Sequence, residues 1–137
     1  MSTLADTSHT APAADLMHIE RWNDTLVVAR FDADTDEALM FLTPVLGPTS
    51  TLVLHRLARA LNSGGPLCWT LADLATTFGV SLGQIDRTID RLERFGYARR
   101  DGFTLAVRTT VPPLTRRHVE RLPRYLAAAY AATESER

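Results

Sequence analysis

The chain has 137 residues, 45% hydrophobic and 23% charged, which is typical of one soluble globular domain with short appendages. Its single cysteine, Cys68, excludes a disulfide framework within the chain, and no apolar run approaches the roughly 20 residues that a membrane span needs. The first residues also lack the basic start and apolar core of a signal peptide, so we expect a cytoplasmic protein with no membrane contact.

The formal net charge of −1 conceals an uneven distribution of charge. Residues 1–40 contain eight acidic residues and two arginines, whereas residues 41–137 contain thirteen arginines and eight acidic residues. Such asymmetry is typical of proteins that contact nucleic acid or carry an acidic arm. Lysine is absent, and although a GC-rich genome alone would favour arginine codons, arginine also suits two-point contacts to phosphate and guanine.

The first part of the chain has little periodicity. Residues 1–14 are rich in Ala, Ser, Thr and Asp, which predicts a disordered leader that is dispensable for folding. In residues 15–31, Leu16, Ile19 and Trp22 fall at helical spacing, and we expect a helix there rather than a strand.

Two helices are predicted next. Thr35, followed by two acidic residues, marks the start of a helix that runs toward Pro44. A break at Gly47 precedes a second helix, and Pro48 suits its first turn because no amide donor is needed there. The apolar stripe of this second helix consists of Leu54, Leu57, Ala58 and Leu61.

Residues 67–96 contain the most informative pattern. A short apolar strand precedes a helix that begins after Thr70 and stops at Gly79. Ser81 and Gln84 then form a capping box, which begins a further helix that ends near Phe95. The expected inward residues of these two helices are Leu71, Leu74, Ala75, Phe78, Leu82, Ile85, Ile89 and Leu92.

A hairpin and a broken helix complete the chain. Asp101-Gly102 lies between two β-like segments, which is a strong hairpin signal, and alternation of Phe103, Leu105 and Val107 predicts that one face of the second strand is buried. Residues 114–133 are expected to form a helix interrupted at Pro123. Its candidate inward residues are Val119, Leu122, Leu126 and Tyr130.

The order of these elements resembles a known family. Residues 74–81 resemble the helix-turn-helix core of bacterial regulators, with Ala75 where the helices meet, Gly79 in the turn, and Val80 and Ile85 filling the gap between the helices. With residues 97–107 as a wing, the chain resembles a winged helix-turn-helix (MarR-like) DNA-binding domain. The resemblance implies a mainly α fold with a small antiparallel β-wing and extra N- and C-terminal helices.

Four segments follow from this interpretation. They are a leader at 1–14, an N-terminal helical extension at 15–46, a winged helix-turn-helix at 47–110 and a C-terminal helical extension at 111–137.

The resemblance implies a function in transcription regulation and names its residues. In such domains the second helix of the motif enters the major groove of duplex DNA with its N-terminal part leading. We expect Gln84 and Arg87 to contact bases and Arg91 and Arg94 to contact phosphates. The full set of candidate DNA-binding residues is Ser81, Gln84, Arg87, Arg91, Arg94, Arg99 and Arg100, the last two from the wing.

A second interpretation fits the same residues. Arg87, Asp90 and Arg94 stand at the spacing of ion pairs on a solvated helix face, and Asp86 would also repel phosphate. The alternative function is a winged helix that docks on the transcription machinery or another protein partner. A continuous basic surface free of acids would favour DNA, whereas neutralisation by Asp86 and Asp90 would favour a protein partner.

The remaining polar residues suggest no further site. A second basic group is expected to form a solvated face of the C-terminal helix, and the alternative is a flank that faces phosphates. Its members are Arg116, Arg117, His118, Arg121 and Arg124. We expect no enzyme activity, metal or cofactor, because the histidines have no partner at metal-ligand spacing, no nucleotide or hydrolase motif occurs, and Cys68 fits a small core residue. Trp22 and Trp69 also fit the core.

A homodimer is expected, since helix-turn-helix proteins usually bind paired half-sites. The alanine-rich segment 125–132 has more apolar residues than one buried stripe requires, and the acidic N-terminal helices are the alternative partner surface.

Overall fold

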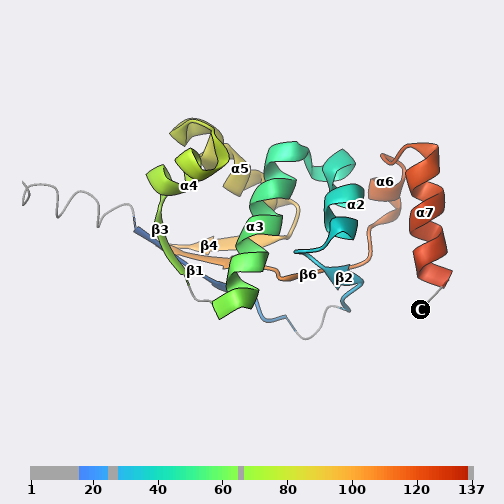
Figure 1. The fold of residues 1–137 in the computed structure, drawn as a ribbon, viewed down its shortest axis with the longest axis horizontal. Helices are drawn as coiled ribbons and strands as arrows, with labels where there is room; N and C mark the ends of the chain where they lie inside the picture. Colours follow the sequence, from blue (N-terminus) through green and yellow to red (C-terminus); the bar gives the residue numbers. More distant parts are fainter. Residues whose placement is uncertain (1–15, 25–27, 65–66, 136–137) are drawn as a thin grey trace, which may run out of the picture.

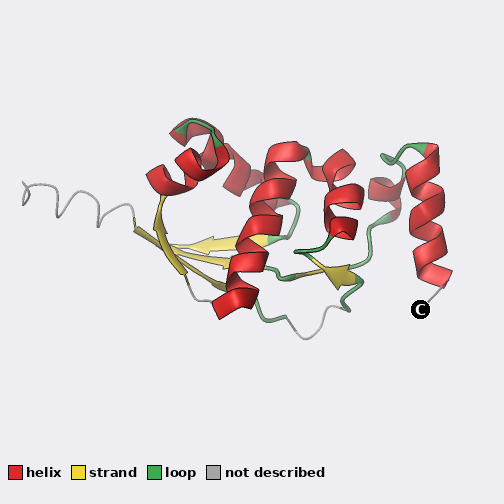
Figure 2. Ribbon diagram, viewed as in Figure 1, coloured by secondary structure: helices red, strands yellow, loops and turns green. Residues whose placement is uncertain are grey.

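The computed structural model describes residues 16–24, 28–64, 67–135 of the chain and combines six helices with a four-stranded sheet and a small two-stranded one (Figures 1 and 2). The predicted leader, residues 1–14, lies outside the described residues. No helix within the described ranges is long and apolar enough to cross a lipid bilayer. In chain order the elements are β1 (Leu16–Arg21), β2 (Phe31–Asp32), α2 (Asp36–Leu46), α3 (Pro48–Gly64), β3 (Leu67–Thr70), α4 (Leu71–Phe78), α5 (Leu82–Arg94), β4 (Ala98–Asp101), β5 (Thr104–Val107), β6 (Thr110–Val111), α6 (Arg116–Val119) and α7 (Arg124–Ser135).

The four-stranded sheet has the order β3-β1-β5-β4 and includes a strand that the sequence did not predict. The prediction of a helix at 15–31 is wrong, because Leu16–Arg21 form the strand β1. In β1, Met17 and Ile19 are buried while His18 and Glu20 are exposed. This alternation is the period of a strand with one buried face. β1 runs antiparallel to β3 and parallel to β5, and α3, α4 and α5 lie over its buried face (Figure 1).

A second, two-stranded sheet lies next to the contact between Arg30 and α7. Phe31 pairs with Val111 in the antiparallel ladder of β2 and β6. Nearby, the buried Arg30 donates to the carbonyl of Tyr130 at 2.8 Å, and its guanidinium lies 4.2 Å from the centre of the Tyr130 ring. Tyr130 also packs edge-on against Phe41 of α2. α7 is therefore held against α2 by one buried aromatic side chain.

The predicted helix boundaries are largely confirmed. The hydroxyl of Thr35 accepts from the amide of Ala38 at the start of α2, which continues through Pro44 to Leu46. α3 begins at Pro48, and its expected stripe is fully buried. The C-terminal helix is broken at Pro123 as expected, with Leu122, Leu126 and Tyr130 buried and Val119 half-buried.

The connection between α4 and α5 has three residues, 79–81. Gly79 adopts the left-handed conformation with φ 68° and ψ 33°, and its amide donates to the carbonyls of Ala75 and Thr76. Val80 also donates to Ala75 at 2.9 Å. Glycine adopts this conformation without strain, so the chain leaves α4 and enters α5 within one tight turn.

Three expectations of burial are wrong. Leu82 is 56% exposed because it occupies the first position of α5, beyond the edge of the core. Phe103 is 65% exposed because it belongs to the turn of the β4–β5 hairpin, while Leu105, Ala106 and Val107 of β5 are all buried. Cys68 is exposed because it lies on the outward face of the sheet, where it pairs with the exposed His18, and its sulfur is 3.5 Å from Nδ1 of His18.

Replacement of Ile19 by alanine tests the inserted strand. Ile19 is completely buried between β3 and β5, so the change should lower the free energy of unfolding by about 2–5 kcal/mol. The matched control is Glu20→Ala on the exposed face of β1, for which we expect a change within about 0.5 kcal/mol. Urea unfolding of both variants measures the difference, and equal midpoints would show that β1 does not support the core.

Candidate nucleic-acid interface

Packing and capping fix the orientation of α5. Ile85, Thr88, Ile89 and Leu92 are buried against the rest of the domain, so the opposite face of the helix must point outward. At the N-terminus, Oγ of Ser81 accepts from the amide of Gln84 at 3.1 Å, and the amide of Ser81 donates to Oε1 of Gln84 at 2.8 Å. The predicted capping box is thus confirmed, and both of its side chains are exposed.

The capping box changes what Gln84 can offer to a ligand. Two-point binding of adenine needs both the carbonyl oxygen and the amino group of a glutamine. Because Oε1 of Gln84 already accepts from the amide of Ser81, one of its two lone pairs is used within the helix. A two-point contact with a base would have to share Oε1 with that amide.

Arg91 binds within the protein. Its Nε donates to the carbonyl of Leu46, the last residue of α2, at 2.6 Å, and its guanidinium lies 5.0 Å from the centre of the Phe95 ring. Arg121 donates to the neighbouring carbonyl of Val45 at 3.3 Å. The last turn of α2 contains no basic residue of its own, so these two arginines supply the positive charge that favours a helix C-terminus.

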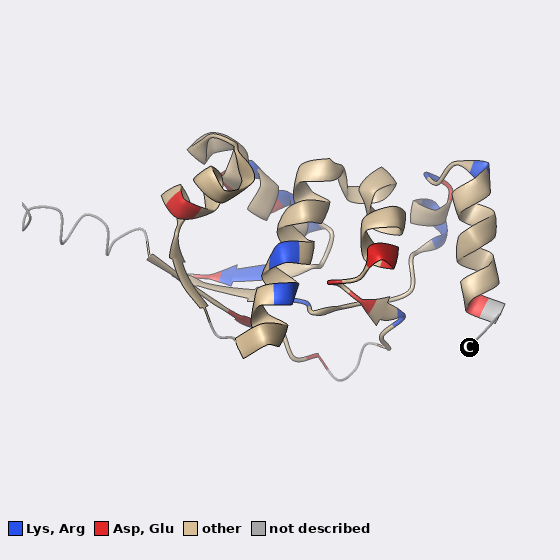
Figure 3. Ribbon diagram, in the orientation of Figure 1, with Lys and Arg blue, Asp and Glu red and all other residues tan. Residues whose placement is uncertain are grey.

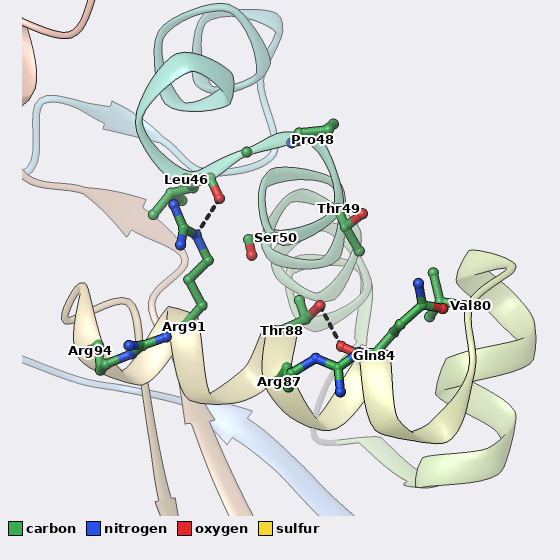
Figure 4. A pocket seen from close by; sticks show the side chains of 11 residues that line it. Leu46, Pro48, Thr49, Ser50, Val80, Gln84, Arg87, Thr88, Arg91 and Arg94 are labelled. Carbon is green, nitrogen blue, oxygen red and sulfur yellow. Dashed lines mark hydrogen bonds between the residues drawn. The ribbon is translucent and has the colours of Figure 1, made fainter.

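Arg87 and Arg94 remain exposed on the outward face of α5. The ion pairs anticipated among Arg87, Asp90 and Arg94 do not form: the three ion pairs of the described residues involve other side chains. Figure 4 shows Arg87, Arg91 and Arg94 along α5, with Arg91 directed to Leu46 at the end of α2.

Between α5 and the start of α3 lies an open hollow of about 500 Å³, here called the α3–α5 hollow. The residues that line it include three arginines and no acidic residue. They are Leu46, Gly47, Pro48, Thr49, Ser50, Val80, Gln84, Arg87, Thr88, Arg91 and Arg94. A neighbouring hollow on α5 is mixed in charge, since Asp90 and Glu93 line it together with Arg87 and Arg94.

The two arginines of β4 are both engaged by neighbours. Arg100 forms an ion pair with Asp86 of α5 at 3.2 Å, and its backbone amide donates to Oε2 of Glu93 at 3.0 Å. Arg99 is exposed and lies 5.1 Å from the centre of the Trp22 ring. Trp22 is half-buried and also lies under Arg108, so it supports the hairpin. Asp86 therefore neutralises Arg100, whereas Asp90 forms no ion pair with Arg87 or Arg94 among the described residues.

The second basic group lies on α6 and at the start of α7, visible as blue segments in Figure 3. Its four arginines are exposed, as expected for a solvated face. His118 differs, because its ring stacks on Phe95 with centroids 5.5 Å apart. Partial burial, together with Arg121 and Arg117, lowers the pKa of His118 below its ordinary value of 6.5.

The start of α3 is the part of this surface that the sequence did not single out. The signal was present, because Gly47 and Pro48 begin a long helix without a side chain that can cap it. Only the fold shows that this helix end faces the arginines of α5. No protein-family model matches the chain, and neither a curated protein nor a solved structure is similar enough to count as a match.

Two arginines of α5 should differ in their effect on stability. Arg91→Met keeps the alkyl contact but removes the donor to Leu46, so it should lower the free energy of unfolding by about 1–3 kcal/mol. Arg94→Met, the matched control on the exposed face, should change it by less than about 0.5 kcal/mol. Urea unfolding distinguishes them, and an equal small effect would contradict the proposed anchoring role of Arg91.

Stability should also depend on pH through His118. Because its pKa is lowered on folding, the unfolded chain binds the proton more readily, and stability should fall as the pH drops below about 6.5. His118→Phe retains an aromatic ring against Phe95 but cannot titrate. In thermal melts, the melting temperature of the variant should rise relative to that of the wild type as the pH is lowered from 8 to 5. A constant difference over this range would show that His118 does not contribute.

Proposed function

We propose that residues 47–110 are a winged helix-turn-helix domain and that the protein binds duplex DNA as a transcriptional regulator, with α5 in the major groove. The order of α3, β3, α4, a three-residue turn, α5 and the β4–β5 hairpin supports this proposal. On paired half-sites, two copies of the chain would bind together as a homodimer.

The outward face of α5 carries the proposal. Arg87 and Arg94 are exposed there and have no ionic partner among the described residues, so their guanidinium groups are available to phosphates and base edges. The helix is held against the rest of the protein by its buried side and by the bond from Arg91 to α2, and the capping box at Ser81 fixes its first turn. A rigid helix that presents free guanidinium groups suits a groove of fixed width.

The geometry revises the role of each candidate. Arg87, in the N-terminal half of α5, is the main candidate for a base contact, and the amino group of Gln84 is the second. Arg94 suits a phosphate, since it lies at the end of the helix. Arg91 acts by positioning α5, and Arg100 acts by joining the hairpin to α5 through Asp86. Arg99 is the basic residue of the hairpin that stays exposed.

A protein partner is the second candidate. Asp86 neutralises one of the expected basic residues, and two large apolar side chains, Leu82 and Phe103, are more than half exposed at the start of α5 and in the hairpin turn. Exposed apolar side chains of this kind are common in protein interfaces. Titrations with duplex DNA distinguish the two functions, because only a DNA-binding regulator requires salt-dependent binding to the duplex.

Arg87→Ala should weaken binding to a preferred duplex by about 1–3 kcal/mol and relax sequence preference. The preferred duplex comes from genome-wide crosslinking of the tagged protein, and fluorescence anisotropy over a salt series measures affinity on it and on a random duplex. Arg56→Ala, an exposed arginine on α3 outside the α3–α5 hollow, serves as the control and should leave sequence preference unchanged.

Two results would contradict the proposal. If Arg87→Ala and the control have the same sequence preference, the base contacts are not made from this face of α5. If the wild-type protein has no salt-dependent affinity for any duplex, the proposed DNA-binding function is wrong and a protein partner is the better proposal.

A further inference from the structure

The amide end of α3 faces the α3–α5 hollow without a capping side chain. Gly47 precedes the helix and Pro48 has no amide hydrogen, so the first helical hydrogen bond runs from Thr51 to Gly47 at 3.1 Å. The amides of Thr49 and Ser50 come before that bond and lack a backbone acceptor among the described residues. Such amides, together with the positive end of the helix dipole, favour an anion.

The side chain of a largely buried serine points to the same space. Ser50 is 4% exposed and lines the α3–α5 hollow, and Figure 4 shows its side chain directed from α3 toward α5. Among the described residues its hydroxyl forms no hydrogen bond, and it is not sealed from solvent, since the one buried side-chain atom found there without a partner is Nε of Arg100. The hydroxyl is therefore open to a ligand or water in the hollow. The hydroxyl can donate to an oxygen that enters the hollow.

The positive charge of the residues that line the α3–α5 hollow favours an anionic ligand. Arg87, Arg91 and Arg94 line the α3–α5 hollow, and no carboxylate does. The carbonyl end of α2, which would repel an anion at this point, is occupied by donors from Arg91 and Arg121. Asp90 and Glu93 of α5 line the neighbouring hollow, which Arg87 and Arg94 also line.

We infer that the α3–α5 hollow binds one phosphate group, through the amides of Thr49 and Ser50, the hydroxyl of Ser50, and the guanidinium group of Arg94. A phosphate offers enough oxygens for all of these donors, and arginine matches its geometry. In the complex with duplex DNA this group is a backbone phosphate, which would fix the register of α5 in the groove. The assignment of this phosphate to the DNA backbone rests on the proposed function, whereas the phosphate site itself does not.

The first arm of the test uses inorganic phosphate alone. In the full-length ¹⁵N-labelled protein, phosphate replaces chloride at constant ionic strength and pH, and amide shifts are followed by NMR. The amides of Thr49 and Ser50 should shift in a saturable way. Ser50→Asp places a carboxylate among the same donors and should abolish the shift. Ser63→Asp, the same substitution about 20 Å further along α3, should retain it.

The second arm measures affinity for a random duplex by anisotropy. Ser50→Asp should bind about tenfold more weakly than Ser63→Asp, because a charge-assisted contact is lost. Arg94→Gln, a surface change that does not strain the fold, should lower the salt slope by about 1 relative to Arg56→Gln. This second pair decides the question if Ser50→Asp does not fold in a thermal melt.

The outcomes separate the possible sources of the phosphate. Amide shifts with phosphate and weaker duplex binding assign a backbone phosphate to the hollow. Amide shifts with no difference in duplex binding between variants and controls assign a free phosphorylated ligand. Absence of both effects overturns the site. If the wild type binds no duplex at all, the proposed function fails, and the phosphate titration alone decides this inference.

Discussion

Gly47 is the point at which two helices meet without a linker. Its φ of 88° and ψ of 161° belong to a region that residues with a Cβ rarely adopt, so the junction depends on glycine. The amide of Gly47 closes α2 by donating to Thr43, and its carbonyl opens α3 by accepting from Thr51. The carbonyl end of one helix and the amide end of the next are thereby brought to the same place, beside α5.

This junction gives the arginines of α5 different tasks. The carbonyl end of α2 attracts Arg91, which fixes the helix and loses its freedom to contact a ligand. The amide end of α3 attracts no side chain, since its neighbours on α5 are Arg87 and Arg94, which it repels. Residues that look equivalent on a helical wheel are separated in this way into an anchor and two free cations. The electrostatic asymmetry of the junction, more than the number of basic residues, creates the candidate interface.

Local signals predicted the elements that local interactions build. Thr35, Thr70 and Ser81 cap the helices that follow them, and Gly79 makes the turn, because caps and turns involve residues close in sequence. The N-terminal strand was missed since Leu16, Ile19 and Trp22 also fit a helical stripe, and its two partner strands come from distant parts of the chain.

The candidate site was predicted in part for the same reason. The outward face of α5 follows from its apolar stripe, so Arg87 and Arg94 were found from the sequence. The partners of Arg91 and Arg100 were not, because Leu46 lies far along the chain and Asp86 reaches Arg100 only after the hairpin packs on α5. The start of α3 became part of the site only when the fold placed it opposite α5.

The insertion of β1 between β3 and β5 has a consequence for synthesis on the ribosome. His18 pairs with Thr104, more than eighty residues later, so β1 is translated long before the strand with which its parallel ladder forms. Closing so long a loop is entropically costly, and contacts of this range slow folding. Until then the nascent chain carries an unpaired, half-apolar strand edge of the kind that chaperones shield. The contacts among α3, α4 and α5 join segments that are closer in sequence, so they do not depend on closing that long loop.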